Sequence, residues 1–180
     1  MSSKITIATC SLAGCFGCHM SLLDVDERLL DLLEIVEFDR SPINDIKSIR
    51  GMVDIGLVEG GLCNEENVHV LQHFREHCLV LVAVGECAVT GGIPSMRNHH
   101  TLRACLEESY IRGTGVDNAH IPDDEELPLL LSKVYPLHEV VTVDYSLPGC
   151  PPSADAFWHF LTEHIAGRDS RLPRQLLRFD

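Results

Sequence analysis

The chain has 180 residues, 45% of them hydrophobic, and carries a formal net charge of −13 at pH 7. This length and composition are typical of one domain with a buried core. The charge argues against nucleic acid and anionic membrane surfaces as partners, because both repel an acidic protein. No apolar run approaches the roughly 20 residues that span a bilayer, and the N-terminus shows neither an export signal nor a twin-arginine pair. We therefore expect a cytoplasmic protein that binds no membrane.

The first third of the chain predicts strands that alternate with a helix. Residues 4–9 are β-branched and apolar, which is typical of a buried strand. Over residues 21–35, leucines and valines recur at helical spacing with acids between them, as in an amphipathic helix. Residues 34–39 predict a second strand, and residues 52–61 predict a third strand that ends in a glycine pair.

The rest of the chain continues this alternation. Residues 64–78 predict a helix with Asn64 as N-cap and two glutamates in the first turn. The near-continuous apolar run at 78–85 is typical of a strand that is covered on both faces. The later elements are expected to be a helix at 99–109, a strand at 140–147 and a helix at 153–166.

Alternating strands and helices predict a parallel sheet with helices on both faces. About five strands of this kind fit an α/β fold with a flavodoxin-like, doubly wound parallel sheet. We expect residues 1–180 to form a single domain of this type. Residues 110–139 are turn-rich and acidic and fit the alternation badly, so we expect an irregular insertion there.

The eight cysteines are a high number for a cytoplasmic chain of this length. In a reducing compartment they are expected to bind metal or to act in catalysis rather than to form disulfides. Cys15 and Cys18 follow the first predicted strand, Cys87 follows the fourth, and Cys150 follows the fifth. The carboxyl ends of parallel strands share one edge of the sheet, where ligands bind. The sequence therefore predicts one four-thiolate site at this edge.

The chemistry of this site is open to four interpretations. Cys-x-x-Cys-His is also an attachment signal for c-type haem, but haem is attached after export. A thiol-redox pair would leave Cys87 and Cys150 unexplained. Structural zinc sites usually join two short Cys-x₂₋₄-Cys turns, whereas this chain has one pair and two distant single cysteines. Glycines flank each cysteine and can direct amide N–H groups at sulfur. These features favour an iron–sulfur cluster, with a zinc-stapled, non-catalytic docking module as the alternative.

Four motifs in order carry a resemblance to a known family. The segments GCFGCHM (14–20), VEGG (58–61), GECAVTGGIP (85–94) and PGCPP (148–152) together resemble the small subunit of NiFe-hydrogenases. They are most similar to the short type found in soluble, bidirectional NAD-reducing enzymes, and the resemblance covers essentially the whole chain. The related cluster-bearing subunit of respiratory complex I has adjacent cysteines in its first loop, where this chain has Cys15 and Cys18 separated by two residues.

The resemblance implies a function and a set of partners. It implies that Cys15, Cys18, Cys87 and Cys150 hold one 4Fe–4S cluster, proximal to a nickel–iron centre in a separate large subunit. Hydrogen would be cleaved at that centre, and electrons would pass through the cluster to a diaphorase module with further clusters, FMN and an NAD(H) site. A complex I-like cluster subunit is the other alternative function.

Some residues near the predicted site have open roles. His19 is expected either to begin the first helix or to donate a hydrogen bond to a cluster sulfur. Glu59 is expected to serve in a turn or, by resemblance, in proton movement. The flavodoxin-like topology also raises an FMN site on this chain, for which only Thr9, Ser11 and Gly14 remain as phosphate-loop candidates.

The other histidines and cysteines are assigned structural roles. His69, His73 and His77 lie four residues apart and are expected to line one solvated or interface face of a helix. Cys78 and Cys105 are expected to act as small apolar residues.

Overall fold

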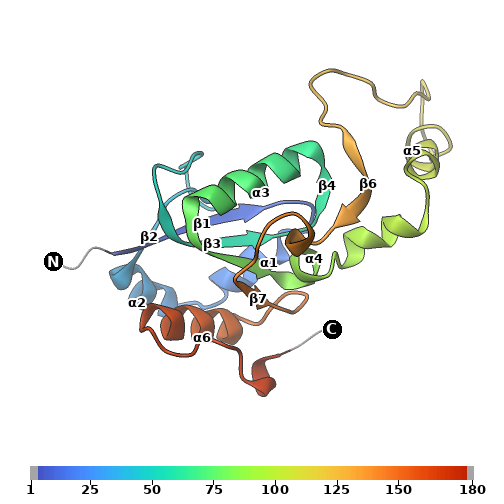
Figure 1. The fold of residues 1–180 in the computed structure, drawn as a ribbon. Helices are drawn as coiled ribbons and strands as arrows, with labels where there is room; N and C mark the ends of the chain where they lie inside the picture. The colour runs from blue at the N-terminus through green and yellow to red at the C-terminus, as the bar shows by residue number, and fades with distance from the viewer. Residues whose placement is uncertain (1–3, 178–180) are drawn as a thin grey trace.

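The computed structural model describes residues 4–177, and its centre is a five-stranded parallel sheet (Figure 1). The strand order is β2-β1-β3-β5-β7, which is the doubly wound, flavodoxin-like arrangement that the sequence predicts. β1 pairs with β2 on one side and with β3 on the other, so the chain reverses its direction of winding at β1. The strands are β1 (Ile5–Ser11), β2 (Val36–Phe38), β3 (Val53–Glu59), β5 (Cys78–Val84) and β7 (Tyr145–Leu147).

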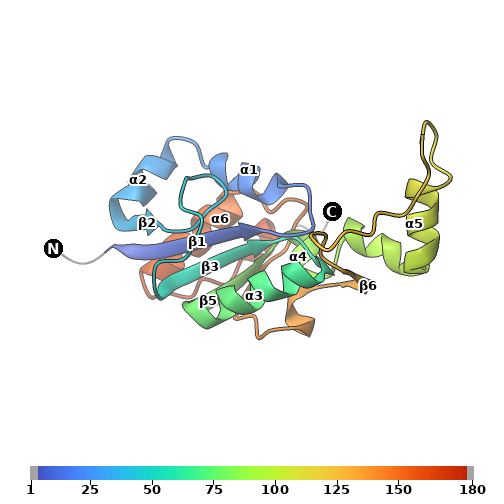
Figure 2. The same ribbon diagram turned by 90° about the horizontal axis from the view of Figure 1, so that it is seen from above.

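Helices cover both faces of this sheet (Figure 2). α1 (Gly17–Leu23), α2 (Arg28–Ile35) and α6 (Ala154–Ile165) lie on one face, and α3 (Glu65–His77) lies on the other. Each face has its own apolar core, built around Phe157 and Phe160 on the α6 side and around Leu71 and Phe74 on the α3 side. The central strands are buried on both faces, which explains their continuous apolar runs.

The single helix predicted over residues 21–35 is two helices in the structure. α1 begins earlier, at Gly17, and ends at Leu23, and α2 starts only at Arg28. Asp26 lies between them with a left-handed backbone (φ 57°), a conformation that Asp tolerates better than most residues. Apolar side chains from both helices still reach the core, so the apolar periodicity alone could not reveal the break.

The cap predicted for the helix after the third strand is confirmed. The Asn64 side chain accepts a hydrogen bond from the backbone N–H of Asn67 (2.8 Å) at the start of α3. Ser153 caps α6 in the same way, through the N–H of Ala156. These bonds satisfy backbone donors that have no partner inside the helix.

The strand predicted at 140–147 is much shorter, with only Tyr145–Leu147 paired to β5. Residues Leu137–Glu139 form a 3₁₀ turn instead. The Asp144 carboxylate accepts from the backbone N–H of Leu81 (2.7 Å) and from Arg75 (2.6 Å). The backbone N–H of Asp144 also donates to the carbonyl of Leu81 (2.9 Å), so Asp144 holds both backbone groups of Leu81 just before the short β7 begins.

The expectation of an irregular insertion at 110–139 is wrong for its last part. β6 (Leu130–Tyr135) pairs antiparallel with the short β4 (Leu62–Asn64). Before it, the chain forms a 3₁₀ helix (Ile93–His99) and α5 (Leu102–Tyr110), which projects away from the main sheet (Figures 1 and 2). The polar residues Ser132 and Lys133 lie inside β6 and hide it from pattern analysis.

The short helix α4 (Gly85–Val89) directly follows β5, and a 3₁₀ turn (Arg174–Leu176) follows α6. Within residues 4–177, no helix has the length and apolar character that crossing a membrane requires.

Candidate metal centre

Four cysteines from three separate segments line one cavity of about 70 Å³ at the carboxyl edge of the sheet. Cys15 lies between β1 and α1, and Cys18 lies in the first turn of α1. Cys87 lies in α4, directly after β5, and Cys150 follows β7. The structure thus confirms that the four cysteines converge on one edge. Their role as ligands stays a prediction.

Two glycines bring the backbone close to cysteine sulfur atoms of the cavity. Gly85 has a positive φ of 79°, and a Cβ atom added there would lie 2.4 Å from the Cys18 Sγ. A Cβ at Gly17 would lie 3.1 Å from the Cys15 Sγ. Gly85 therefore needs to be glycine, whereas a Cβ at Gly17 would require the Cys15 sulfur to move by only a few tenths of an ångström.

Hydrogen bonds tie the three segments together. The backbone N–H of Glu86 donates to the carbonyl of Gly149 (2.9 Å), and the Glu86 side chain accepts from the N–H of Gly149 (3.3 Å). Ala13 and Gly61 exchange a pair of backbone bonds (3.0 and 2.8 Å) that hold the first cysteine loop against the end of β3. The cysteines are therefore held by the fold itself.

The two inner thiols are poor acids in the metal-free chain. Burial raises the pKa of the Cys18 thiol, and the negative charge of Glu59 raises it further. Burial also raises the pKa of Cys87, with the neighbouring Cys150 adding to the effect. Cys15 and Cys150 are exposed, so the cavity opens to the surface on their side. A metal would have to displace protons from the inner pair.

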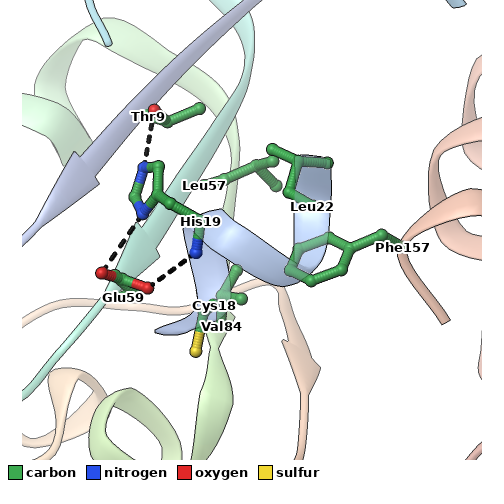
Figure 3. A pocket seen from close by; sticks show the side chains of 8 residues that line it. All are labelled: Thr9, Cys18, His19, Leu22, Leu57, Glu59, Val84 and Phe157. Atoms are coloured by element: carbon green, nitrogen blue, oxygen red, sulfur yellow. Dashed lines mark hydrogen bonds and ion pairs between the residues drawn. The ribbon is translucent and has the colours of Figure 1, made fainter. Parts of the chain in front are cut away.

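A buried polar network lies directly behind Cys18 (Figure 3). His19 is 4% exposed and Glu59 is 3% exposed. The Nδ1 atom of His19 lies 3.2 Å from Oε1 of Glu59, and its Nε2 atom lies 2.9 Å from Oγ1 of Thr9. Both ring nitrogens are therefore engaged, so the expected hydrogen bond from His19 to a sulfur is wrong. The ring instead stacks on Phe16, at 4.6 Å between centroids, and so supports the loop between the two cysteines.

Glu59 is held by several donors. Its carboxylate accepts from the Ser11 hydroxyl (2.7 Å), from the backbone N–H of His19 (3.0 Å) and from the His19 ring. Burial raises the pKa of Glu59, but the hydrogen bonds from His19 and Ser11 outweigh it and leave that pKa below its usual value. Glu59 does more than take part in the expected turn, because its side chain links the end of β3 to β1 and α1. The sequence places this acid at the edge of the sheet beside a glycine turn, but its contacts with Ser11 and His19 depend on the fold and were not predicted.

The hydroxyls proposed for an FMN phosphate already have internal partners. Thr9 Oγ1 lies 2.6 Å from Ser41 Oγ and 2.9 Å from the His19 ring, and the Ser11 hydroxyl donates to Glu59. FMN binding by this chain stays a prediction that these contacts do not favour.

The roles expected for Cys78 and for the exposed histidines of α3 are confirmed, whereas the role expected for Cys105 is not. Cys78 is buried, whereas Cys105 is only half-buried and does not belong to either core. His69 and His73 lie on α3, and His73 stacks on His77 at 4.2 Å between centroids. In the described part of the chain, no three His, Cys, Asp or Glu side chains are grouped to hold a single metal ion.

Known proteins match this chain over nearly its whole length. The family described as NADH ubiquinone oxidoreductase, 20 Kd subunit, matches residues 15–164. The NAD-reducing hydrogenase HoxS subunit delta of Cupriavidus necator is 49% identical, over 98% of this chain and 86% of that protein. One subunit of the F420-non-reducing hydrogenase vhu of Methanococcus voltae is 37% identical over 98% of this chain, which spans only 62% of that longer protein.

Solved structures agree with the sequence relatives. A chain in a crystal structure of NAD⁺-reducing [NiFe]-hydrogenase in the H₂-reduced state superposes with a TM-score of 0.96 at 52% identity, covering 99% of this chain and all of that one. A [NiFeSe]-hydrogenase from Dm. baculatum shares the fold alone, with a TM-score of 0.59 at 17% identity over 92% of this chain and 63% of that one. The chain therefore belongs to the NADH ubiquinone oxidoreductase 20 Kd subunit family and, within it, to the hydrogenase subunits related to HoxS subunit delta.

Proposed function

We propose that this chain is the electron-transfer small subunit of an NAD-reducing NiFe-hydrogenase, with one 4Fe–4S cluster held by Cys15, Cys18, Cys87 and Cys150. The observation that carries the proposal is the convergence of these four thiols on one cavity at the sheet edge. The identity of 49% to a subunit of an NAD-reducing hydrogenase supports the same conclusion.

The residues around the cavity fit such a cluster. Each iron of a 4Fe–4S cube needs one thiolate, and three segments of the chain supply four. Gly17 and Gly85 keep the approach to the sulfurs free of side chains. When bound, the cluster takes up and releases one electron, and its potential depends on hydrogen bonds, charge and burial.

The relatives suggest which subunit of the complex would carry out each step of the reaction. We propose that hydrogen is cleaved at a nickel–iron centre of a large subunit that covers the exposed side of the cavity, near Cys15 and Cys150. Electrons then pass to or from a diaphorase module that carries FMN, further clusters and the NAD(H) site. In this proposal residues 1–180 form a single cytoplasmic domain that positions the relay and performs no acid–base step of its own.

Iron analysis of the complex tests this function. In the anaerobically purified complex, Cys87→Ser and Cys150→Ser should each remove this chain's cluster and stop hydrogen-dependent NAD reduction. Cys105→Ser is the matched control, because this cysteine is half-buried in α5 and does not line the cavity. It should keep full iron content and turnover.

Three outcomes would contradict the proposal. Normal iron content and turnover in both cavity variants would remove the ligand assignment. One zinc and no iron in this chain would support the zinc-stapled docking module instead. An iron-loaded complex that oxidises NADH but neither forms nor consumes hydrogen would support the complex I-like alternative.

A further inference from the structure

We propose that the buried carboxylate of Glu59 lowers the reduction potential of the cluster at Cys15, Cys18, Cys87 and Cys150. This inference rests on the proposed function, because it needs the cluster on this chain. It adds a tuning residue that is not itself a ligand and acts through its charge.

Glu59 is positioned for this role by the end of β3. It lines the four-cysteine cavity together with Cys18, and it also lines the smaller cavity behind Cys18 (Figure 3). With 3% of its surface exposed, it has almost no water to screen its charge. A buried acid normally costs stability unless it is well hydrogen-bonded. Its position beside the thiols therefore points to a function other than stabilising the fold.

The surrounding donors favour the charged form of this side chain. The Ser11 hydroxyl, the His19 backbone N–H and the His19 ring all contact the two carboxylate oxygens, at 2.7, 3.0 and 3.2 Å. The His19 ring is itself fixed by Thr9, which in turn contacts Ser41. Hydrogen bonds to the charged form of a carboxyl group stabilise that form. Glu59 is therefore a fixed negative charge held at one place beside the cavity.

A fixed negative charge opposes the arrival of an electron. Reduction adds one negative charge to the cluster, and the cluster's potential responds to the charge around it. Inside a protein, the effective dielectric constant is far below that of water. A unit charge a few ångströms away can therefore change the ratio of reduced to oxidised forms more than tenfold.

The Glu59→Gln substitution removes the charge while keeping the shape. The amide oxygen of the introduced side chain can remain the acceptor for the His19 N–H, because that donor contacts only Oε2. The amide NH₂ would then replace Oε1 and face the Ser11 hydroxyl and the His19 ring, both of which can also accept a hydrogen bond. The network can therefore survive with its donors reversed.

Glu86 is the matched control. It lines the same cavity, but it is only half-buried, and its carboxylate is engaged with the Thr90 hydroxyl and the Gly149 N–H. Water screens a charge in such a position. Neutralising Glu86 should therefore shift the potential less than neutralising Glu59.

The experiment is a redox titration of the purified complex, followed by electron paramagnetic resonance. This chain's cluster is identified as the signal that the Cys87→Ser complex lacks, and iron is counted in every variant. Glu59→Gln should favour the reduced cluster about tenfold over the wild type, which is about 59 mV upward for one electron. Glu59→Asp, which keeps the charge, should stay close to the wild type, and Glu86→Gln should shift less than Glu59→Gln.

The outcomes separate this inference from the proposed function. A wild-type chain without iron would overturn the proposed function itself. An iron-loaded Glu59→Gln complex with an unchanged midpoint, or a Glu86→Gln shift of equal size, would overturn the inference alone. Loss of iron in Glu59→Gln but not in Glu59→Asp would assign Glu59 to holding the cysteine loop, and would also overturn it.

Discussion

The substitution Gly85→Ala tests whether the backbone at the end of β5 is shaped around the Cys18 sulfur. Gly85 has φ 79°, and its added Cβ would lie 2.4 Å from that sulfur, about 1 Å inside ordinary contact. Gly115 offers a matched control, because it has the same φ of 79° but nothing within 4 Å of an added Cβ. The two variants share the backbone penalty and differ only in the crowding at Cys18.

The expected magnitudes follow from these contacts. A left-handed backbone costs an L-residue about 1–2 kcal/mol, which both variants should show as a loss in the free energy of unfolding. Overpacking a well-filled site adds about 1–3 kcal/mol, and only Gly85→Ala should show this extra loss. Because the Cys18 sulfur must move, Gly85→Ala should also lower the iron content of this chain in the complex, whereas Gly115→Ala should leave it unchanged.

Denaturant unfolding of the full chain and iron analysis of the complex measure the two effects. Equal losses in the free energy of unfolding for both variants would show that the Cys18 sulfur does not crowd a side chain at position 85. Full iron content in Gly85→Ala would show that the cavity tolerates a displaced Cys18 sulfur.

Two further predictions concern the sheet edge and the thiols. Asp144→Ala should destabilise the chain by about 1–3 kcal/mol, because the Leu81 N–H loses a charged acceptor. Asp155→Ala, which removes an exposed ion pair with Arg28, should cost at most about 1 kcal/mol, and equal losses in denaturant unfolding would contradict the role given to Asp144. Iron uptake by the metal-free chain, followed by absorbance, should weaken as the pH falls and should release protons, because the raised pKa values of Cys18 and Cys87 keep these thiols protonated. Uptake that is independent of pH would mean that the inner thiols are already ionised.

The parallel sheet and the convergence of the four cysteines on one edge could be predicted from the amino-acid sequence alone. Continuous apolar runs such as 78–84 mark strands that are buried on both faces. In a parallel sheet, the loops that directly follow the strands all lie at the same edge, because the carboxyl ends of the strands point the same way. Cys87 and Cys150 could therefore be assigned to the same site as Cys15 and Cys18 without coordinates. Local caps such as Asn64 were also readable, because a cap depends only on residues within one turn.

Features that depend on partners far apart in the chain became visible only in the folded structure. β4 and β6 pair although they lie far apart in the chain, and neither segment has a periodicity that reveals its partner. Asp144 binds both backbone groups of Leu81 on β5, one with its carboxylate and one with its own N–H, although the two residues lie far apart in the chain. His19 and Glu59 came together for the same reason, since the first loop and the end of β3 approach each other only in the folded sheet. Apolar periodicity reports which face is buried, whereas the partner of a polar side chain is set by packing between elements far apart in the chain.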